Sequence, residues 1–127
     1  MCFCLNRLHV NTFVLFFSTL CFSTFRPPEL LKDGLLTKAA DVYAFGVLLW
    51  ELYNGKRAWA GANVGQVIFA VTCRVEALVM PPSAPQDLQV LVGSCLAANF
   101  EERPSFDQIA AELTRIKACV ARAKMAT

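Results

Sequence analysis

The fold is decided by residues 41–52, which read DVYAFGVLLWEL. From Val42 to Leu52 only Gly46 and Glu51 interrupt the apolar run. A helix that is apolar on all sides lies inside a protein or a membrane, and this run is shorter than the about 20 residues that cross a bilayer. The pattern therefore predicts a buried core helix.

The sequence on either side of this run supplies helix boundaries. Thr37 is placed to open the central helix, and Gly55 is placed to end it after Asn54 in a left-handed conformation. Upstream, Pro27-Pro28 is expected to end any helix or strand that precedes it, because proline fixes its own φ and restricts the residue before it. A short helical turn, Glu29–Leu31, is expected before the Asp33-Gly34 turn.

Three amphipathic helices are predicted downstream. Asn63 is the expected N-cap of the first of them, and Ser105 and Gln108 have capping-box spacing at the start of the last. Acidic residues gather in 99–112 and basic residues in 113–127, as the dipole of the last helix favours. No run alternates as a strand would, so the fold class is all-α. The apolar stripes are Val64, Val67, Ile68 and Val71; Leu88, Leu91, Val92, Cys95 and Leu96; and Ile109, Leu113, Ile116 and Val120.

Composition excludes some functions. The chain has 127 residues, 56% hydrophobic and 17% charged, with 12 basic residues, 10 acidic residues and a net charge of +2. That balance gives neither a polybasic nucleic-acid arm nor an acidic tail. One modest domain is the expectation for this length.

Residues 1–25 differ from the rest of the chain. They hold six of the ten Phe and three of the six Cys, with Arg7 as their one charged side chain. The run Val10–Phe25 is short and polar for a membrane span. A secretory signal or anchor fits its length better, with Arg7 as a thin positive flank, although no Ala-x-Ala-like cleavage site follows. A buried strand and a mispredicted start that was never selected to fold also stay open.

The spacing of the cysteines does not indicate a metal site. Cys2-x-Cys4 is too tight for the usual zinc pair, and no second pair or His completes it. Cys95 falls on an apolar stripe, and Cys73 and Cys119 adjoin such stripes, where a free Cys acts as a small hydrophobe. We therefore expect a reduced, intracellular body, with the cytoplasm favoured.

Three landmarks on this string of helices resemble protein kinases. Pro27-Pro28-Glu29 resembles the Ala-Pro-Glu motif that closes the activation segment. The run from Asp41 through Gly46 to Leu52 is similar to the Asp-x-Trp-x-x-Gly signature and the central helix of the C-lobe, with Tyr43 in place of Trp. Arg103-Pro104-Ser105-Phe106 resembles the Arg-Pro element near the end of the domain, and its residues are most similar to those of the tyrosine-kinase-like group.

The resemblance singles out a structural motif of six residues and implies roles for some of them. Glu29 would pair with Arg103, and Asp41 would accept hydrogen bonds from the backbone of the catalytic loop. Gly46 would permit a close backbone approach, and Trp50 would belong to the core. The structural motif is thus Pro28, Glu29, Asp41, Gly46, Arg103 and Pro104.

The chemistry of the kinase family needs residues that this sequence lacks. There is no Gly-rich loop with its strand Lys, no His-Arg-Asp-x-x-x-x-Asn and no Asp-Phe-Gly. The one His, His9, is followed by Val10-Asn11, and Glu101-Glu102 is expected to be a solvated turn. We predict no catalytic, cofactor or metal residues in this chain, since ATP and Mg²⁺ belong to the complete domain.

The resulting expectation is a truncated kinase domain, the helical half of a C-lobe, over residues 26–120. Residues 1–25 would be an atypical apolar segment and 121–127 a tail. We expect it to be inert as written and to require the missing N-lobe and catalytic loop for its full fold. The alternative is a non-enzymatic C-lobe remnant that binds partner proteins through the helices 64–71 and 88–96. A protein substrate or docking partner fits both, whereas nucleic acid and membrane do not.

Overall fold

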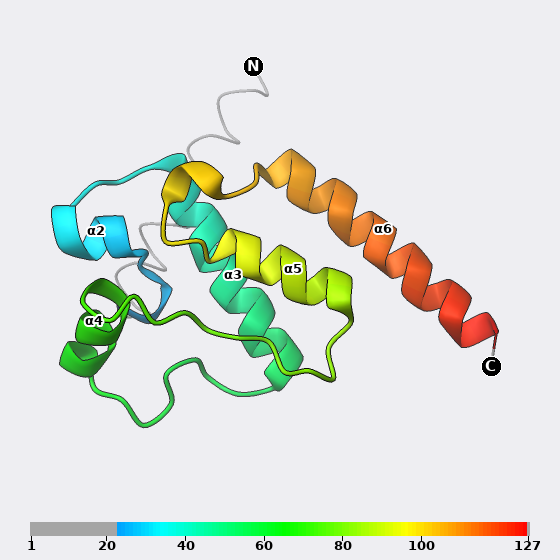
Figure 1. Ribbon diagram of the computed structural model, residues 1–127, viewed down its shortest axis with the longest axis horizontal. Helices are drawn as coiled ribbons and strands as arrows, with labels where there is room; N and C mark the ends of the chain where they lie inside the picture. The colour runs from blue at the N-terminus through cyan, green and yellow to red at the C-terminus, as the bar shows by residue number, and fades with distance from the viewer. Residues whose placement is uncertain (1–22, 127) are drawn as a thin grey trace, which may run out of the picture.

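Helix α3 (Lys38–Asn54) runs through the middle of the computed structural model, which describes residues 23–126 (Figure 1). Helix α5 (Gln86–Cys95) lies along it, and α6 (Phe106–Met125) packs on the far side of α5 and projects outward at its C-terminal end. At the other side α4 lies beside α2. The remaining elements are η1 (Ser23–Phe25), α2 (Pro28–Asp33), α4 (Val64–Thr72) and η2 (Phe100–Glu102).

The helix boundaries largely follow the local signals. Gly55 ends α3 in the left-handed region with φ 65°. Asn63 caps α4, and Ser105 and Gln108 form the predicted reciprocal capping box on α6. Thr37 precedes α3 as predicted, but its hydroxyl makes no capping bond and is buried without a hydrogen-bond partner. The turn expected at 29–31 is a longer helix, α2.

The core consists of two clusters that share α3 and α5. The first surrounds Val47 and Val92, which are fully buried, and Trp50 packs against it while donating its indole N–H to the Val79 carbonyl at 2.9 Å. The second joins α3 and α5 to α6 through Val42, Leu91, Cys95, Ile109 and Ile116. Together they hold α5 and α6 against the central helix α3.

Several predicted burials are wrong, and the reason is shared. Leu52 ends the apolar run of α3 yet is 71% exposed. Val64 and Ile68 on α4 and Val120 on α6 are also exposed, although they continue stripes whose other members are buried or partly buried. Cys73 and Cys119 are exposed rather than packed against those stripes. Periodicity predicts an apolar face, but it does not say which part of that face a neighbouring element covers.

The all-α prediction is confirmed for the part of the chain that the structure describes, since residues 23–126 contain no strand. The fold resembles the helical half of a kinase C-lobe. Within those residues no helix is both long and apolar enough to cross a bilayer. The interpretations of the apolar head, residues 1–22, lie outside the described residues, and α6 continues through 121–125, which we expected to be a tail.

Candidate functional site

A buried ion pair joins Glu29 of α2 to Arg103, which lies in the short segment between η2 and α6. Arg103 Nη1 donates to Glu29 Oε1 at 2.7 Å, and Nη2 donates to Oε2 at 2.9 Å. Both residues are buried, with exposed fractions of 8% and 7%. Glu29 lies in the first turn of α2, where Pro28 supplies a preset helical φ and the helix dipole favours an acid. The planar fork of Arg matches a carboxylate in this two-point geometry.

The remaining contacts of Arg103 draw two more segments into the same cluster. Its Nε donates to the carbonyl of Ala97 at 2.9 Å, after α5, and Nη1 also donates to the carbonyl of Ala39 at 3.0 Å, in the first turn of α3. The guanidinium lies over the ring of Tyr43, 5.1 Å from its centroid. We call Glu29, Arg103 and Tyr43, with the carbonyls of Ala39 and Ala97, the arginine clamp.

The electrostatics of the clamp follow from burial. Desolvation raises the pKa of Tyr43 to about 12, with Arg103 lowering it and Glu29 raising it by smaller amounts. The phenol therefore stays neutral, and its ring face can act as the weakly polar partner of the guanidinium. Pro104 follows Arg103 directly and leads into Ser105, the N-cap of α6. The clamp thus fixes where α6 begins.

Gly46 lies where α3 packs tightly against the C-terminal end of α5. A Cβ built on Gly46 would lie 2.8 Å from the Cβ of Cys95 and 3.1 Å from Leu96 Cδ2. Side chains do not approach that closely, so only Gly fits this crossing without a shift of the two helices. Cys95 is fully buried there, and this burial raises the pKa of its thiol to about 11.

One side of α3 is apolar but incompletely covered. Asp41, Phe45, Leu48 and Leu52 recur at i, i+4, i+7 and i+11 and so share one side of the helix. The first three are half-buried and Leu52 is exposed. We call these four residues the open face of α3.

The one acidic residue on the open face, Asp41, has no polar partner among residues 23–126. Within residues 23–126 the Asp41 carboxylate has no hydrogen-bond or ion-pair partner, and desolvation raises its pKa. At the same end, Phe45 meets Phe106 of α6 edge-on, with ring centroids 5.8 Å apart. The resemblance to kinases predicted backbone donors for Asp41; the described residues supply none.

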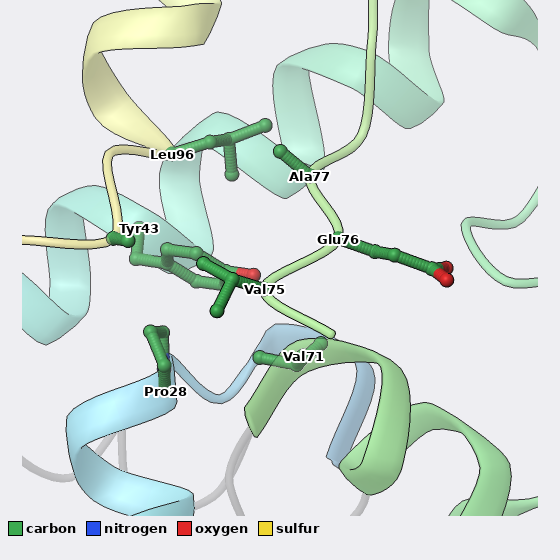
Figure 2. A pocket seen from close by; sticks show the side chains of 8 residues that line it. Pro28, Tyr43, Val71, Val75, Glu76, Ala77 and Leu96 are labelled. Carbon is green, nitrogen blue, oxygen red and sulfur yellow. The ribbon is translucent and has the colours of Figure 1, made fainter. Parts of the chain in front are cut away.

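A small cavity lies beside the clamp. It measures about 40 Å³ and is lined mainly by apolar side chains, among them Pro28, Val71 and Leu96. Figure 2 shows the ring of Tyr43 on one side of it and the Glu76 carboxylate directed away from it. A space of this size admits a few waters at most, whereas ligand sites are much larger. Among the described residues no three His, Cys, Asp or Glu come together as metal ligands.

The six residues of the predicted structural motif thus lie in three places. Pro28, Glu29, Arg103 and Pro104 come together at the clamp, while Gly46 lies at the crossing with α5 and Asp41 on the open face. Sequence reasoning missed the two carbonyls, because any residue can supply one. It noted Tyr43 as an aromatic replacement but did not foresee its stacking on Arg103, for which the aromatic type at that position was the available signal.

The family described as protein tyrosine and serine/threonine kinase matches residues 18–113, which is most of the chain. The chain belongs to the protein kinase family. Its relatives are kinases of the tyrosine-kinase-like type. It is similar to mitogen-activated protein kinase kinase kinase 11 of Homo sapiens, with 34% identity over 95 residues that cover 75% of this chain and 11% of the relative.

Two further relatives are also matched over only a small part of their own length. Mitogen-activated protein kinase kinase kinase dlk-1 of Caenorhabditis elegans is 37% identical over 82 residues, 65% of this chain and 9% of its own. The serine/threonine/tyrosine-protein kinase HT1 of Arabidopsis thaliana is 36% identical over 93 residues, 73% of this chain and 24% of its own. The matched part of this kinase-family chain therefore spans between about a tenth and a quarter of these relatives.

Proposed function

We propose that this chain is the scaffolding half of a kinase C-lobe, from a family that transfers phosphate from ATP to Ser, Thr or Tyr of proteins, and that it transfers no phosphate by itself. The observation that carries the proposal is the arginine clamp. It ties Glu29, directly after the Pro-Pro landmark, to Arg103 of the Arg-Pro landmark by two short hydrogen bonds. This is the pairing that the kinase resemblance implies for these two positions.

The absence of activity is proposed from chemistry. Phosphoryl transfer requires a positioned nucleotide, metal ions and a group that orients the attacking hydroxyl. The residues that supply these in the family have no counterpart in the sequence of 127 residues. ATP and Mg²⁺ would accordingly bind to a complete domain and not to this part of it.

The open face supports a scaffolding role. It places one desolvated carboxylate, Asp41, at the end of an apolar strip formed by Phe45, Leu48 and Leu52. A partly buried carboxylate without donors is costly, and backbone N–H groups are suitable partners for it. In a complete kinase domain this face would hold the catalytic loop, with Asp41 fixing the loop backbone.

A chimera tests the scaffolding role. Residues 27–116 would replace the matching segment of human mitogen-activated protein kinase kinase kinase 11, and ATP-dependent phosphorylation of a generic protein substrate would be measured. We expect the chimera to be active and the 127-residue chain alone to be inactive and not to bind ATP in a calorimetric titration. Asp41→Asn in the chimera should lower kcat while leaving its melting temperature nearly unchanged. Asp33→Asn, at an exposed position of α2, should change neither kcat nor the melting temperature.

Two results would overturn the proposal. A chimera that folds but transfers no phosphate would show that this segment cannot support a catalytic loop. Phosphorylation or saturable ATP binding by the purified 127-residue chain would contradict its inertness.

The second candidate function is a protein-interaction module without catalysis. It is favoured by α4, where Val64, Ile68 and Phe69 are exposed. Helix α5 is less suitable, because Leu91, Val92 and Cys95 are used inside the fold. This candidate requires the purified chain to unfold cooperatively as a monomer; a spectrum without near-ultraviolet structure would argue against it.

A further inference from the structure

The last turn of α3 carries an Asn-Gly pair, Asn54-Gly55, at the point where the helix ends. Asn is a thermolabile residue type, and a glycine has no side chain to shield its own backbone nitrogen. In an open chain that nitrogen can attack the side-chain amide carbon of the Asn before it. The pair is therefore a chemical site as well as a helix end.

In the folded chain both reacting groups are held in hydrogen bonds. The Gly55 N–H donates to the Glu51 carbonyl at 2.8 Å, and Asn54 Nδ2 donates to the Trp50 carbonyl at 2.8 Å. The reaction requires the Gly55 nitrogen to lose its proton and to approach Asn54 Cγ, so these bonds must break first. The folded turn thus protects a pair that its sequence makes reactive.

This turn can open without unfolding the core. Leu52 is 71% exposed and Tyr53 is 41% exposed, so little apolar burial holds the turn in place. Trp50, by contrast, packs against the first core cluster and donates its indole N–H to the Val79 carbonyl at 2.9 Å. A helix end with few buried contacts opens at a lower free-energy cost than the core. We therefore expect the opening of α3 to stop at Trp50.

We propose that Asn54 is a deamidation site that is gated by the last turn of α3, and that the product does not restore this turn. The deprotonated Gly55 nitrogen forms a bond to Asn54 Cγ, and the bond from Cγ to Nδ2 breaks. Ammonia leaves with the proton that Gly55 gave up, and a cyclic imide remains. Water then opens the imide at either of its carbonyls, which gives aspartate or isoaspartate at position 54 with no oxidation or reduction.

The product lacks what Asn54 contributes to the helix end. A carboxylate cannot donate a hydrogen bond, so the contact with the Trp50 carbonyl is lost. The product also places a negative charge at the C-terminus of a helix, where the helix dipole disfavours anions. Isoaspartate in addition lengthens the main chain before Gly55. None of these steps depends on phosphoryl transfer, so the proposal stands apart from the proposed kinase scaffold.

Peptide mapping of the full 127-residue chain by mass spectrometry tests the gating. The chain would be incubated at neutral pH, either folded or in guanidinium chloride, and the conversion at position 54 would be followed over time. Asp33→Asn in the same chain supplies a second Asn-Gly pair as the matched control. Gly34 also ends its helix at φ 65°, like Gly55, but the side chain at position 33 is exposed, whereas Asn54 is half-buried.

We expect position 54 to convert severalfold more slowly than position 33 in the folded chain, and at a similar rate in guanidinium chloride. The difference in the folded chain would come from the bond of Asn54 to the Trp50 carbonyl. Conversion at position 54 that is as fast as at position 33 in the folded chain would overturn the gating. A lack of conversion at position 54 in guanidinium chloride would overturn the site itself.

Asn54→Asp tests the consequence of the modification. It carries the charge of the product and should speed hydrogen exchange of the Gly55 amide severalfold, because that amide is bonded to the last turn of α3. The matched control is Asn99→Asp, which adds the same charge at an exposed position before η2 and should leave this exchange unchanged. Equal exchange in the two variants would contradict a lasting opening, and the rates at positions 54 and 33 decide the gating if Asn54→Asp fails to fold.

Discussion

Arg103 shows how a single residue can connect distant parts of a small fold. Its guanidinium makes four hydrogen bonds, to both oxygens of Glu29 and to the carbonyls of Ala39 and Ala97. A buried charge is tolerated only when it is paired in this way. The pair is weak evidence for net stability, but removing one partner leaves the other uncompensated.

Glu29→Gln and Arg103→Met should each lower the free energy of unfolding by about 3–5 kcal/mol, because each leaves one buried charge without its partner. The double variant Glu29→Leu with Arg103→Met should lose less than the sum of the single changes. Urea unfolding of the three variants measures this. Strict additivity, or single losses within the scatter of the measurement, would show that the clamp contributes no coupling.

Gly46→Ala should destabilise the fold, because its new Cβ would lie 2.8 Å from the Cβ of Cys95 and would push α3 from α5. Gly93→Ala is the matched control: Gly93 is also helical but has nothing within 4 Å of the added Cβ. There Ala should stabilise by roughly 0.5–1 kcal/mol through its helix propensity. Thermal melts compare the two, and equal shifts would contradict a tight crossing.

At the scale of elements, the sequence predicted where helices begin and end better than it predicted which of their faces are buried. Gly55, Asn63 and Ser105 act locally, within a few residues of the backbone groups that they satisfy, so their signals are readable without a fold. The exposure of Leu52 depends on what packs against α3, which no local pattern contains. Thr37 shows that a local signal can place a helix start without predicting its contacts. Thr is a favoured N-cap residue, but the Thr37 hydroxyl makes no hydrogen bond to the helix.

The candidate site was predictable only through resemblance. Periodicity and composition cannot connect Glu29 with Arg103, which are 74 residues apart. The kinase motifs connected them, because the motifs carry information about a shared fold. The stacking of Tyr43 and the two backbone acceptors depend on coordinates that residue types do not specify.

Ser105→Ala should cost about 1 kcal/mol of stability, since it leaves a backbone N–H at the start of α6 without its acceptor. Adding Gln108→Ala should cost less in this background than in the parent chain, because the two side chains form one reciprocal box. Thr114→Ala, at an exposed position within α6, serves as the control with little expected loss. Urea midpoints measure all four variants, and a neutral Ser105→Ala would contradict the role of the box.

At the scale of the whole molecule, burial of neutral acids makes stability depend on alkaline pH. The pKa of the Cys95 thiol rises from 9.0 to about 11 and that of Tyr43 from 10.0 to about 12 on folding. The folded chain then holds these protons more tightly than the unfolded chain. Their contribution is complete below pH 9.0 and is lost as pH rises toward the folded values.

The free energy of unfolding should therefore fall above pH 9.0, and this fall should be shallower in Cys95→Ala than in the parent chain. Cys119→Ala, at an exposed position, should keep the parental slope. Chemical unfolding on either side of pH 9.0 gives the slopes. An unchanged slope in Cys95→Ala would show that the buried thiol does not contribute.

The long sequence separation within the arginine clamp has a kinetic consequence. Closing a loop of 74 residues costs chain entropy before the ion pair returns any stabilisation, whereas the helix caps and the α3 turn contacts form locally. The clamp should therefore be absent from the folding transition state, so that Glu29→Gln accelerates unfolding and leaves the refolding rate nearly unchanged. Stopped-flow chevrons would separate the two rates, and the ion pair would then set the lifetime of the folded chain and not the speed at which it forms.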